Sequence, residues 1–520
     1  MSSTGPSPIA PVMRLYDINS RATTISLANV LDATSGKLAR SKQTREELGA
    51  DPSIWFDLRR IWTDLARAQL TFWDDSEGDD QTDRQSHLKN ICLSVARFTR
   101  NLVAGVPHNQ ELAFENEPQI RRLLHYYTSW SAAEDKRTIP VTCMLAQMLS
   151  NIVTSNEGLT TELWELYTSL PEDQVILLRL LSYPDHRTVL TVLVLIMNCI
   201  KGSKKRIKLL CTTVIGSRIC IMILDTMIRL YDAEEQSDGG QAFDIGYEIF
   251  SLLIQQGHVP DLYSKFSMTD EPVTPHQTTL LKIVDSYLQS KQSKNGVVTY
   301  EIHEMLSPLL ATSFLSLSAY AQSAIDRSLG STATGTIPSE LDISLPRACE
   351  ALVLLTQCMV TISLAAEEQA LHLSDESSRT NLKNYLSEQQ DEKQGIVESL
   401  VELLRLLDLF LPRINFGKPV TSNPLSAQKT FDENHDVTGF SYLKRDLVRL
   451  LGILCHKERN IQERIRICGG IPVIMNLCVI DERNPYLKEH AILTLHNILE
   501  NNLENQRVID SIKPINQDET

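Results

Sequence analysis

Aromatic residues and long apolar runs are scarce in this sequence. Aromatics make up 6% of the 520 residues, and Leu and Ile fill most apolar positions. This composition suits helices packed on helices better than a β-sandwich. The longest apolar stretch, Val189 to Ile200, would form a helix about 18 Å long, whereas a bilayer core of about 30 Å needs about 20 residues. We therefore predict a buried helix there and no membrane span.

Targeting signals and enzyme motifs are missing as well. Met1–Pro11 lacks the basic and apolar segments of a secretory signal, so the expected location is cytoplasmic. There is no C-x-x-C pair, no G-x-G-x-x-G, no Walker A motif and no G-x-S-x-G. His303-Glu304 begins like a zinc-protease motif, but Ser307 stands where the second ligand belongs. We expect no enzyme activity, no metal and no cofactor, although carboxylates from distant repeats could still converge.

The cysteines give no sign of a metal or redox site. They lie mostly in apolar helical patterns, which favours reduced, buried thiols. The ten are Cys92, Cys143, Cys199, Cys211, Cys220, Cys349, Cys358, Cys455, Cys468 and Cys478.

A positive charge excess is also absent, because the formal net charge is −15. An acidic chain is a poor ligand for nucleic acid and for anionic membranes. The one basic cluster, Lys201–Lys208, falls at a junction between predicted helices. It is interpreted as a solvated loop, with docking of an acidic or phosphorylated partner as the alternative. Trp55 and Trp62 share a helix face and belong either to the core or to an exposed binding patch.

What the sequence does contain is helical periodicity. Leu443–Cys455, Leu487–Leu499 and Ile396–Leu411 carry apolar residues at the spacing of helices. No convincing two-residue alternation and no hairpin signal appear. In Asn460–Leu499, Gly469-Gly470 ends a short helix, Pro472 starts a second one, and a long helix follows. This is the layout of one armadillo repeat.

The junction after the long helix recurs along the chain. Segments beginning at Asn101, Asn151, Asn198, Gly452 and Asn497 align, at spacings of about 45 to 50 residues, which are typical of armadillo and HEAT repeats. Three carry a second polar anchor eight residues on, at Asn109, Asn460 and Asn505. In armadillo proteins that bind extended peptides, an Asn near the end of each long helix contacts the peptide. The candidate partner-binding residues are therefore Asn101, Asn151, Asn198 and Asn497, although Asn also satisfies backbone groups near helix ends.

These patterns predict an all-α fold, an armadillo- or HEAT-like right-handed α-solenoid of stacked helical repeats. We expect a partly disordered segment and first helices in 1–50, armadillo-like repeats in 51–231 and degenerate helical repeats with loop insertions in 241–411. A mobile loop in 412–439 then precedes C-terminal repeats in 440–513. The structural turn of the C-terminal repeats is assigned to Gly469, Gly470 and Pro472.

The C-terminal stretch Ser441–Gln506 resembles the ataxin-10 family. The matching features are Lys444-Arg445-Asp446-Leu447, Leu450-Leu451-Gly452, Gly469-Gly470-Ile471-Pro472, Ile480-Asp481 with Asn484-Pro485, and Leu499-Glu500-Asn501-Asn502. Ile453, His490 and Leu503 depart from the family's usual Asn, Trp and Pro and favour a distant, fungal member. The resemblance implies an armadillo-like fold, a cytoplasmic location and a non-catalytic role in regulating cytokinesis or signalling assemblies.

The predicted function is a scaffold for other proteins or peptides. A transport adaptor carrying protein cargo is the alternative, but such an adaptor should show tryptophans at regular intervals along its groove. All five tryptophans lie in the first third of the chain. The oligomeric state stays open.

Overall fold

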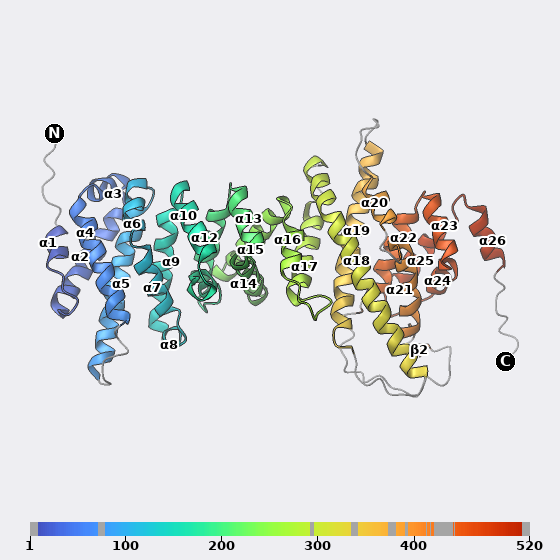
Figure 1. Cartoon of the computed structure of the whole chain (residues 1–520), viewed down its shortest axis with the longest axis horizontal. Helices are drawn as coiled ribbons and strands as arrows, with labels where there is room; N and C mark the ends of the chain where they lie inside the picture. The colour runs from blue at the N-terminus through green and yellow to red at the C-terminus, as the bar shows by residue number, and fades with distance from the viewer. Residues whose placement is uncertain are drawn as a thin grey trace. The chain divides into compact units, whose positions relative to one another are not determined.

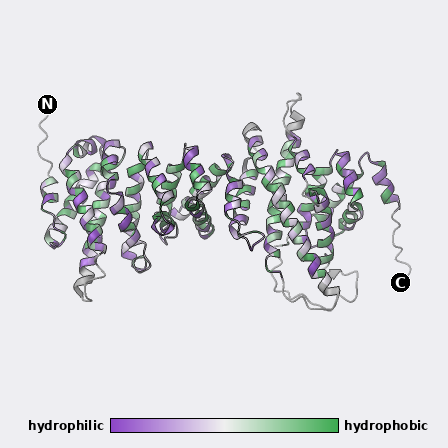
Figure 2. Cartoon of the chain, in the orientation of Figure 1, coloured by the Kyte–Doolittle hydropathy of each residue, from purple (hydrophilic) through white to green (hydrophobic). Residues whose placement is uncertain are grey.

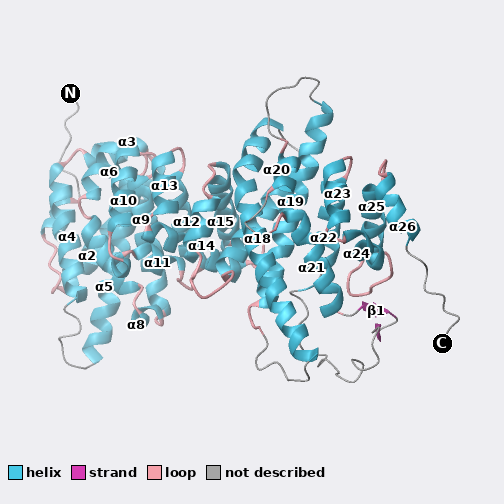
Figure 3. Ribbon diagram, turned by 45° about the vertical axis from the view of Figure 1, so that its right-hand side comes forward, coloured by secondary structure: helices cyan, strands magenta, loops and turns pink. Residues whose placement is uncertain are grey.

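The structure, a computed structural model, describes residues 9–70, 79–291, 296–333, 342–372, 381–389, 394–411, 413–415, 418–420, 440 and 442–511. Apart from one short two-stranded ladder, the regular structure in these ranges is helical (Figures 1 and 3). The prediction of an all-α repeat fold is confirmed. The chain forms two compact units, residues 1–256 and 257–520.

In the first unit, helices recur in threes: a short first helix, a second helix and a long third helix. The long helices pack one against the next along the unit. They are α2 (Arg21–Arg40), α5 (Asp79–Val103), α9 (Ile139–Val153), α12 (His186–Ile200) and α15 (Asp238–Gln255). The first helices are α3 (Lys42–Gly49), α6 (Pro107–Phe114), α10 (Glu157–Ser169) and α13 (Lys204–Thr212). The second helices are α4 (Pro52–Leu70), α7 (Glu117–Tyr127), α11 (Ile176–Leu181) and α14 (Val214–Leu230); α1 (Ala10–Arg14), α8 (Trp130–Ala133) and the 3₁₀ turns Lys136–Thr138 and Glu172–Gln174 complete the unit.

Local sequence explains these helix boundaries. Asn156 and Ser203 cap α10 and α13, because their side-chain oxygens accept the N–H groups of Leu159 and Arg206. Pro107 starts α6, where a missing N–H costs nothing. Hydrophobic and hydrophilic residues alternate around the helices (Figure 2). The packed helices of each unit bury the hydrophobic ones.

The second unit has the same layout in its C-terminal half. α20 (Leu382–Glu388), α21 (Ile396–Phe410) and α22 (Leu443–Cys455) form one repeat. The next repeat comprises α23 (Arg459–Ile467), α24 (Gly470–Leu477) and α25 (Leu487–Leu499), and α26 (Leu503–Ser511) follows. Within Leu487–Leu499, predicted as an amphipathic helix, Ile492 is 49% exposed, while Thr494 and Asn497 are buried.

The start of this unit departs from the three-helix pattern. Its helices are α16 (Val259–Lys265), α17 (Pro275–Lys291), α18 (Gly296–Ala333) and α19 (Leu345–His372). α18 contacts both α20 and α21, which are the first and second helices of the next repeat. One long helix, with Pro308 inside it, therefore takes both places. This fusion explains why the sequence shows no clear repeat there.

A left-handed residue marks six of the turns from a long helix to the next first helix. These residues are Gly105, Ser155, Gly202, Gly257, Lys457 and Asn501, with φ of 69°, 62°, 79°, 75°, 58° and 56°. We call the residue four places before each one the ladder position; the ladder residues are Asn101, Asn151, Asn198, Leu253, Ile453 and Asn497. The sequence alignment that placed Gly452 in this series was one residue out of register.

A short β-ladder lies inside the segment predicted as a loop, 412–439. β1 (Arg413–Asn415) and β2 (Lys418–Val420) pair antiparallel, with Ile414 opposite Pro419. The backbone of Ile414 is fixed from outside the ladder: its N–H donates to Asp481 Oδ1 over 3.2 Å, and its carbonyl accepts from Glu482 N. The rest of the predicted loop lies outside the described residues.

One helix in the described part of the chain is long and apolar enough to cross a membrane. It covers Leu345–Glu368 within α19, and 67% of its most apolar window is buried inside the protein. Helices α13 and α14 pass the same test as a pair, but they meet at a bend of 83°. Burial of this kind is also what the core helix of a helical stack shows.

The Gly469-Gly470 turn leads to the first prediction. Gly469 has φ of +74° and open space around its Cα, whereas a Cβ on Gly470 would come within 2.7 Å of Ile465. Gly469→Val should lower the free energy of unfolding by about 1–3 kcal/mol, because a β-branched residue is strained there. Gly469→Asn, which tolerates the left-handed conformation, should lose much less. Equal losses for the two variants in urea melts of the full chain would contradict the assignment.

Candidate functional site

The ladder asparagines join each long helix to the one before it. Asn151 Nδ2 donates to the carbonyl of Arg100 over 3.2 Å, and Asn497 Nδ2 donates to the carbonyl of Gly452 over 3.0 Å. In both cases the acceptor directly precedes the ladder residue of the preceding repeat. Asn101 Nδ2 donates in the same way to Ser35 in α2. The amide donors thus hold neighbouring repeats in register.

Asn198 differs from the other three. Its Nδ2 lies 3.4 Å from Thr154 Oγ1, at the limit of a hydrogen bond. Asn101 and Asn497 are buried, whereas Asn151 and Asn198 are half-buried. A contact between these asparagines and a bound peptide stays a prediction, and Asn151 and Asn198 are the two that are accessible for it.

A second set of side chains reaches forward to the next long helix. Gln110 Nε2 donates to the carbonyls of Asn151 and Thr154, each over 2.9 Å. Gln462 Nε2 donates to those of Asn497 and Glu500 over 2.8 and 3.4 Å. Each glutamine stands nine residues after a ladder position, in different units of the chain. The two units are therefore built from the same repeat.

The second polar residue predicted from the sequence alignment binds backbone carbonyls at two of its three positions. Asn109 Nδ2 donates to the carbonyls of Leu102 and Arg45, and Asn505 Nδ2 donates to those of Ile498 and Gln462. Asn460 was wrong, because it is exposed and the equivalent residue in the corrected register is Ile461. A one-residue shift moves a side chain by about 100° around a helix, from the interface to solvent.

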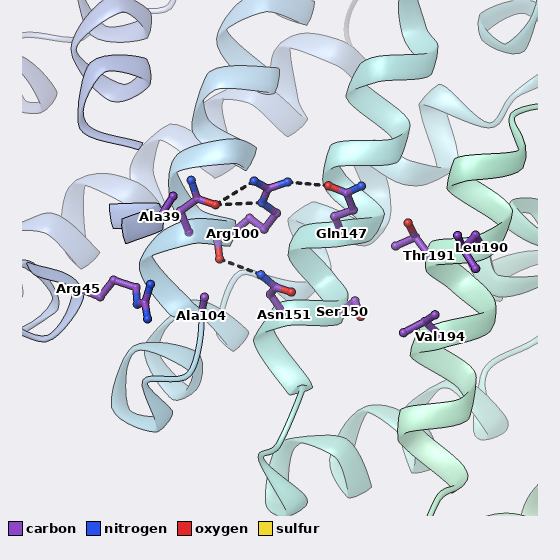
Figure 4. Close-up of a pocket in the computed structure, with 11 residues that line it drawn as sticks. Ala39, Arg45, Arg100, Ala104, Gln147, Ser150, Asn151, Leu190, Thr191 and Val194 are labelled. Atoms are coloured by element: carbon purple, nitrogen blue, oxygen red, sulfur yellow. Dashed lines mark hydrogen bonds between the residues drawn. The ribbon is translucent and has the colours of Figure 1, made fainter. Parts of the chain in front are cut away.

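A groove opens over the long helices of the first unit beside Asn101 and Asn151 (Figure 4). Its volume is about 440 Å³. We call it the long-helix groove. The lining residues come from α2, α3, α5 with the turn after it, α9 and α12: Ala39, Arg45, Arg100, Asn101, Ala104, Gln147, Ser150, Asn151, Leu190, Thr191 and Val194.

Arg100 crosses the middle of the groove (Figure 4). Its Nη1 donates to Gln147 Oε1 over 2.6 Å, and its Nε and Nη2 both donate to Asn101 Oδ1 over 3.0 Å. These acceptors are neutral amide oxygens. Burial, and then the nearby charges of Arg97 and Arg187, lower the pKa of Arg100. The groove thus concentrates positive charge on an acidic chain.

Sequence reasoning found the asparagines of this groove and missed Arg45, Arg100 and Gln147. A signal was available, because Arg100 precedes a ladder position and Gln147 lies one helical turn before Asn151. Arg45 occupies the place that Gln110 and Gln462 hold in other repeats, since Asn109 binds its carbonyl as Asn505 binds that of Gln462.

Burial divides the basic cluster Lys201–Lys208: its lysines are exposed, but its arginine is not. Arg206 is buried, and its guanidinium binds the carbonyl of Cys199 and the carboxylate of Glu157. Lys205 pairs with Glu165 at the surface. Arg206 therefore takes the role of Asn109 and Asn505, which corrects the interpretation of the whole cluster as a solvated loop.

The described tryptophans of the first unit do not gather in one exposed binding patch. Trp55 and Trp62 are 2% and 0% exposed and belong to the core. Trp164 is also buried and donates to the carbonyl of Arg206 over 3.0 Å. Trp130 is 84% exposed at the start of α8, outside the groove. Trp73 lies outside the described residues.

The matching features of the C-terminal resemblance are mostly structural. Lys444 is 1% exposed, and its ammonium binds Asp408 over 3.3 Å and the carbonyl of Leu411 over 3.1 Å. Asp481 accepts from Asn484 Nδ2 and from the backbone that anchors β1. Gly452 allows α22 and α25 to pack closely, because a Cβ there would come within 2.4 Å of Thr494 Oγ1.

Titratable side chains form no cluster resembling a metal site in the described ranges. No three His, Cys, Asp or Glu side chains gather there as ligands would. All ten cysteines are free thiols, eight of them buried. Burial raises the pKa of Cys455 to about 12, which keeps it protonated. Burial lowers the pKa of His303 from 6.5 to about 4.

The fold and the groove define an armadillo-like helical repeat protein. Residues 443–520 match the family described as the spinocerebellar ataxia type 10 protein domain. Residues 443–520 thus carry the similarity to an ataxin-10 domain that the resemblance predicted.

Individual relatives support this assignment over part of their length. An ataxin-10 homolog of Dictyostelium discoideum is 40% identical over 97 residues, covering 19% of this chain and 15% of the relative. Ataxin-10 of Bos taurus is 29% identical over 166 residues, covering 29% and 33%. An ataxin-10 homolog of Schizosaccharomyces pombe is 27% identical over 119 residues, covering 23% and 26%. The aligned part is thus at most a third of each of these relatives.

Two solved structures are similar over nearly the whole chain. An engineered protein has a TM-score of 0.38 at 11% identity and covers 95% of this chain and 99% of its own. SYS-1 has a TM-score of 0.35 at 13% identity, with coverages of 96% and 94%.

The ladder contacts predict different costs for two asparagines. Asn101→Ala should lower the free energy of unfolding by about 1–3 kcal/mol, because it leaves a buried carbonyl without its donor. Asn198→Ala should change it by less than about 0.5 kcal/mol, as for an ordinary surface substitution. Urea melts of both variants measure the difference. Equal losses would mean that Asn198 is as much a part of the ladder as Asn101.

Burial of His303 predicts a pH dependence. The folded-state pKa of about 4 lies below the ordinary value of 6.5, so the unfolded chain binds more protons between these values. Stability should therefore fall as pH drops from about 6.5 to about 4, by about 2–3 kcal/mol in total. His303→Leu should remove this loss. An unchanged pH slope in urea melts of the variant would contradict it.

Proposed function

We propose that this chain is a non-catalytic cytoplasmic scaffold that binds extended protein segments in the long-helix groove. The observation that carries the proposal is the groove itself, which runs across α5, α9 and α12. Arg100, Gln147 and Asn151 offer both donors and acceptors there. A stacked array presents such faces side by side, and the surface then fits a chain in extended form.

A transport adaptor is the weaker alternative. Such a role called for tryptophans along the groove, and none of its lining residues is aromatic. The ladder position is Asn in three successive repeats of the first unit, but it is Leu253 in α15 and Ile453 in the second unit. These differences favour a local peptide-binding site in the first unit over one continuous binding site along the whole chain.

The ataxin-10 domain supports a second part of the proposal, that the scaffold acts in cytokinesis. This part rests on the family resemblance alone. Deletion of the gene in the source organism should raise the fraction of cells with more than one nucleus. Expression of the 520-residue chain in the deletion strain should return that fraction to its normal value. A normal nuclear count in the deletion would contradict this role.

The groove is tested by filling it. Thr191 and Val194 line it and are half-buried on α12, so Thr191→Arg with Val194→Arg should block a bound segment sterically. Ile228 on α14 is 56% exposed and does not line the groove, so Ile228→Arg serves as the control. Tagged chains are used to capture partners from cytosol, quantified by mass spectrometry.

We expect the double variant to lose at least one partner that the control retains, with an unchanged thermal melt in both. The proposal fails if both variants capture the same partners in the same amounts. Loss of partners together with loss of helical circular dichroism would assign these residues to the core and also contradict it.

A further inference from the structure

The surface around the long-helix groove carries an excess of arginine. Arg45 and Arg100 line the groove itself. A second hollow of about 330 Å³ adjoins it across Gln147 and is lined by Arg97 and Arg187. The only carboxylate among the residues that line either cavity is Asp185.

The nearby carboxylates are already engaged. Asp32 pairs with Arg97 over 2.7 Å and also accepts from Ser94. Asp185 caps α12, where its Oδ2 accepts from the N–H and the hydroxyl of Thr188 over 2.9 and 2.6 Å. Neither carboxylate contacts the guanidinium groups that line the groove. The charge there is left for another molecule to neutralise.

Arg100 and Arg45 have donors to spare. A guanidinium carries five N–H donors, and the hydrogen bonds of Arg100 to Gln147 and Asn101 use three of them. Its acceptors are amide oxygens, which orient the group without cancelling its charge. Arg45 donates through Nη1 to the carbonyl of Leu38, and its buried Nε has no hydrogen-bond partner. Arg45 lies at one end of the groove, and Arg100 lies in its middle (Figure 4).

We propose that the long-helix groove selects an acidic segment, an extended peptide whose Asp or Glu carboxylate pairs with Arg100 and Arg45. The inference rests on the proposed function and adds the chemistry of the partner. A planar guanidinium matches a carboxylate through two parallel hydrogen bonds. The small side chains of Ala39, Ala104 and Ser150 leave room beside the arginines for the peptide backbone. Asn151, which lines the groove beside Ser150 on α9, lies within reach of that peptide backbone.

The net charge of the chain sharpens the inference. At −15 the protein repels acidic molecules at long range, so binding must come from short-range contacts inside the groove. Added salt then has two opposed effects. It weakens the long-range repulsion between the chain and the peptide, and to a smaller extent it weakens the ion pair between the peptide carboxylate and the arginines of the groove. Arginine contacts in the groove, and not overall charge, should decide affinity.

The experiment measures binding of fluorescein-labelled peptides to the full chain by anisotropy. One short peptide alternates Glu and Ser, a second replaces Glu by Gln, and a third replaces Glu by Lys. A fourth alternates phosphoserine and Ala. We expect the Glu peptide to bind at least about tenfold more tightly than the Gln peptide, as hydrogen bonds to charged groups require. The Lys peptide should not bind.

Three variants locate the contact. Arg100→Gln and Arg45→Gln should each weaken the Glu peptide by about tenfold. Arg122→Gln, on α7 and exposed but outside the groove, is the matched control and should have no effect. Because Arg100 also joins α5 to α9, Arg100→Lys and a thermal melt of each variant accompany it. Lys keeps the charge without the paired geometry, so it should restore part of the affinity.

The outcomes separate this inference from the proposed function. If Glu and Gln peptides bind equally, and both are lost in the variant with Thr191→Arg and Val194→Arg, the groove binds peptides and the acidic preference is wrong. If the phosphoserine peptide alone binds, the carboxylate assignment is wrong. If no peptide and no captured partner depends on the groove, both proposals fall.

Discussion

The repeats of this protein depend on how the carbonyl groups at the ends of the long helices are satisfied. The last carbonyls of a helix have no partner within it. Here side chains from neighbouring repeats provide the donors: Asn109 for Leu102, Gln110 for Asn151, Arg206 for Cys199, and Gln462 for Asn497. Each bond therefore closes one helix and fixes the position of the next. The left-handed residue that follows turns the chain so that these side chains can reach.

The same constraint forms the groove. Because side-chain amides hold successive long helices side by side, their outer faces are left uncovered by the chain itself. The ladder asparagines of the groove already bind backbone carbonyls of the preceding helix. The groups without a carboxylate partner there are Arg45 and Arg100. Arg100 is held by amides, which orient a charge and do not neutralise it. Such an arrangement fixes the orientation of a positive charge at the surface of the long helices.

The ataxin-10 domain applies this principle with its own side chains. Lys444, Asp408 and the carbonyl of Leu411 form a buried polar contact between α21 and α22. Asp481 and Asn484 shape the loop that anchors β1. Lys444, Asp481 and Asn484 are among the residues that carried the resemblance, and all three are buried. The features that identify the family are thus those that build its last repeats, while the arginine-lined groove lies in the other unit.

The sequence alone determined the helical class, the three-helix repeat and the place of Gly469, because periodicity, glycine and proline act through local backbone geometry. It also located the ladder at Asn101, Asn151, Asn198 and Asn497. The tertiary structure decided what local patterns cannot express. It moved the register from Gly452 to Ile453, because only the left-handed turn at Lys457 and the bond from Asn497 fix the alignment. It also buried Arg206, fused two repeat helices into α18, and brought Arg45, Arg100 and Gln147 together from three helices. Those contacts join residues that lie tens of positions apart, so no local spacing could reveal them.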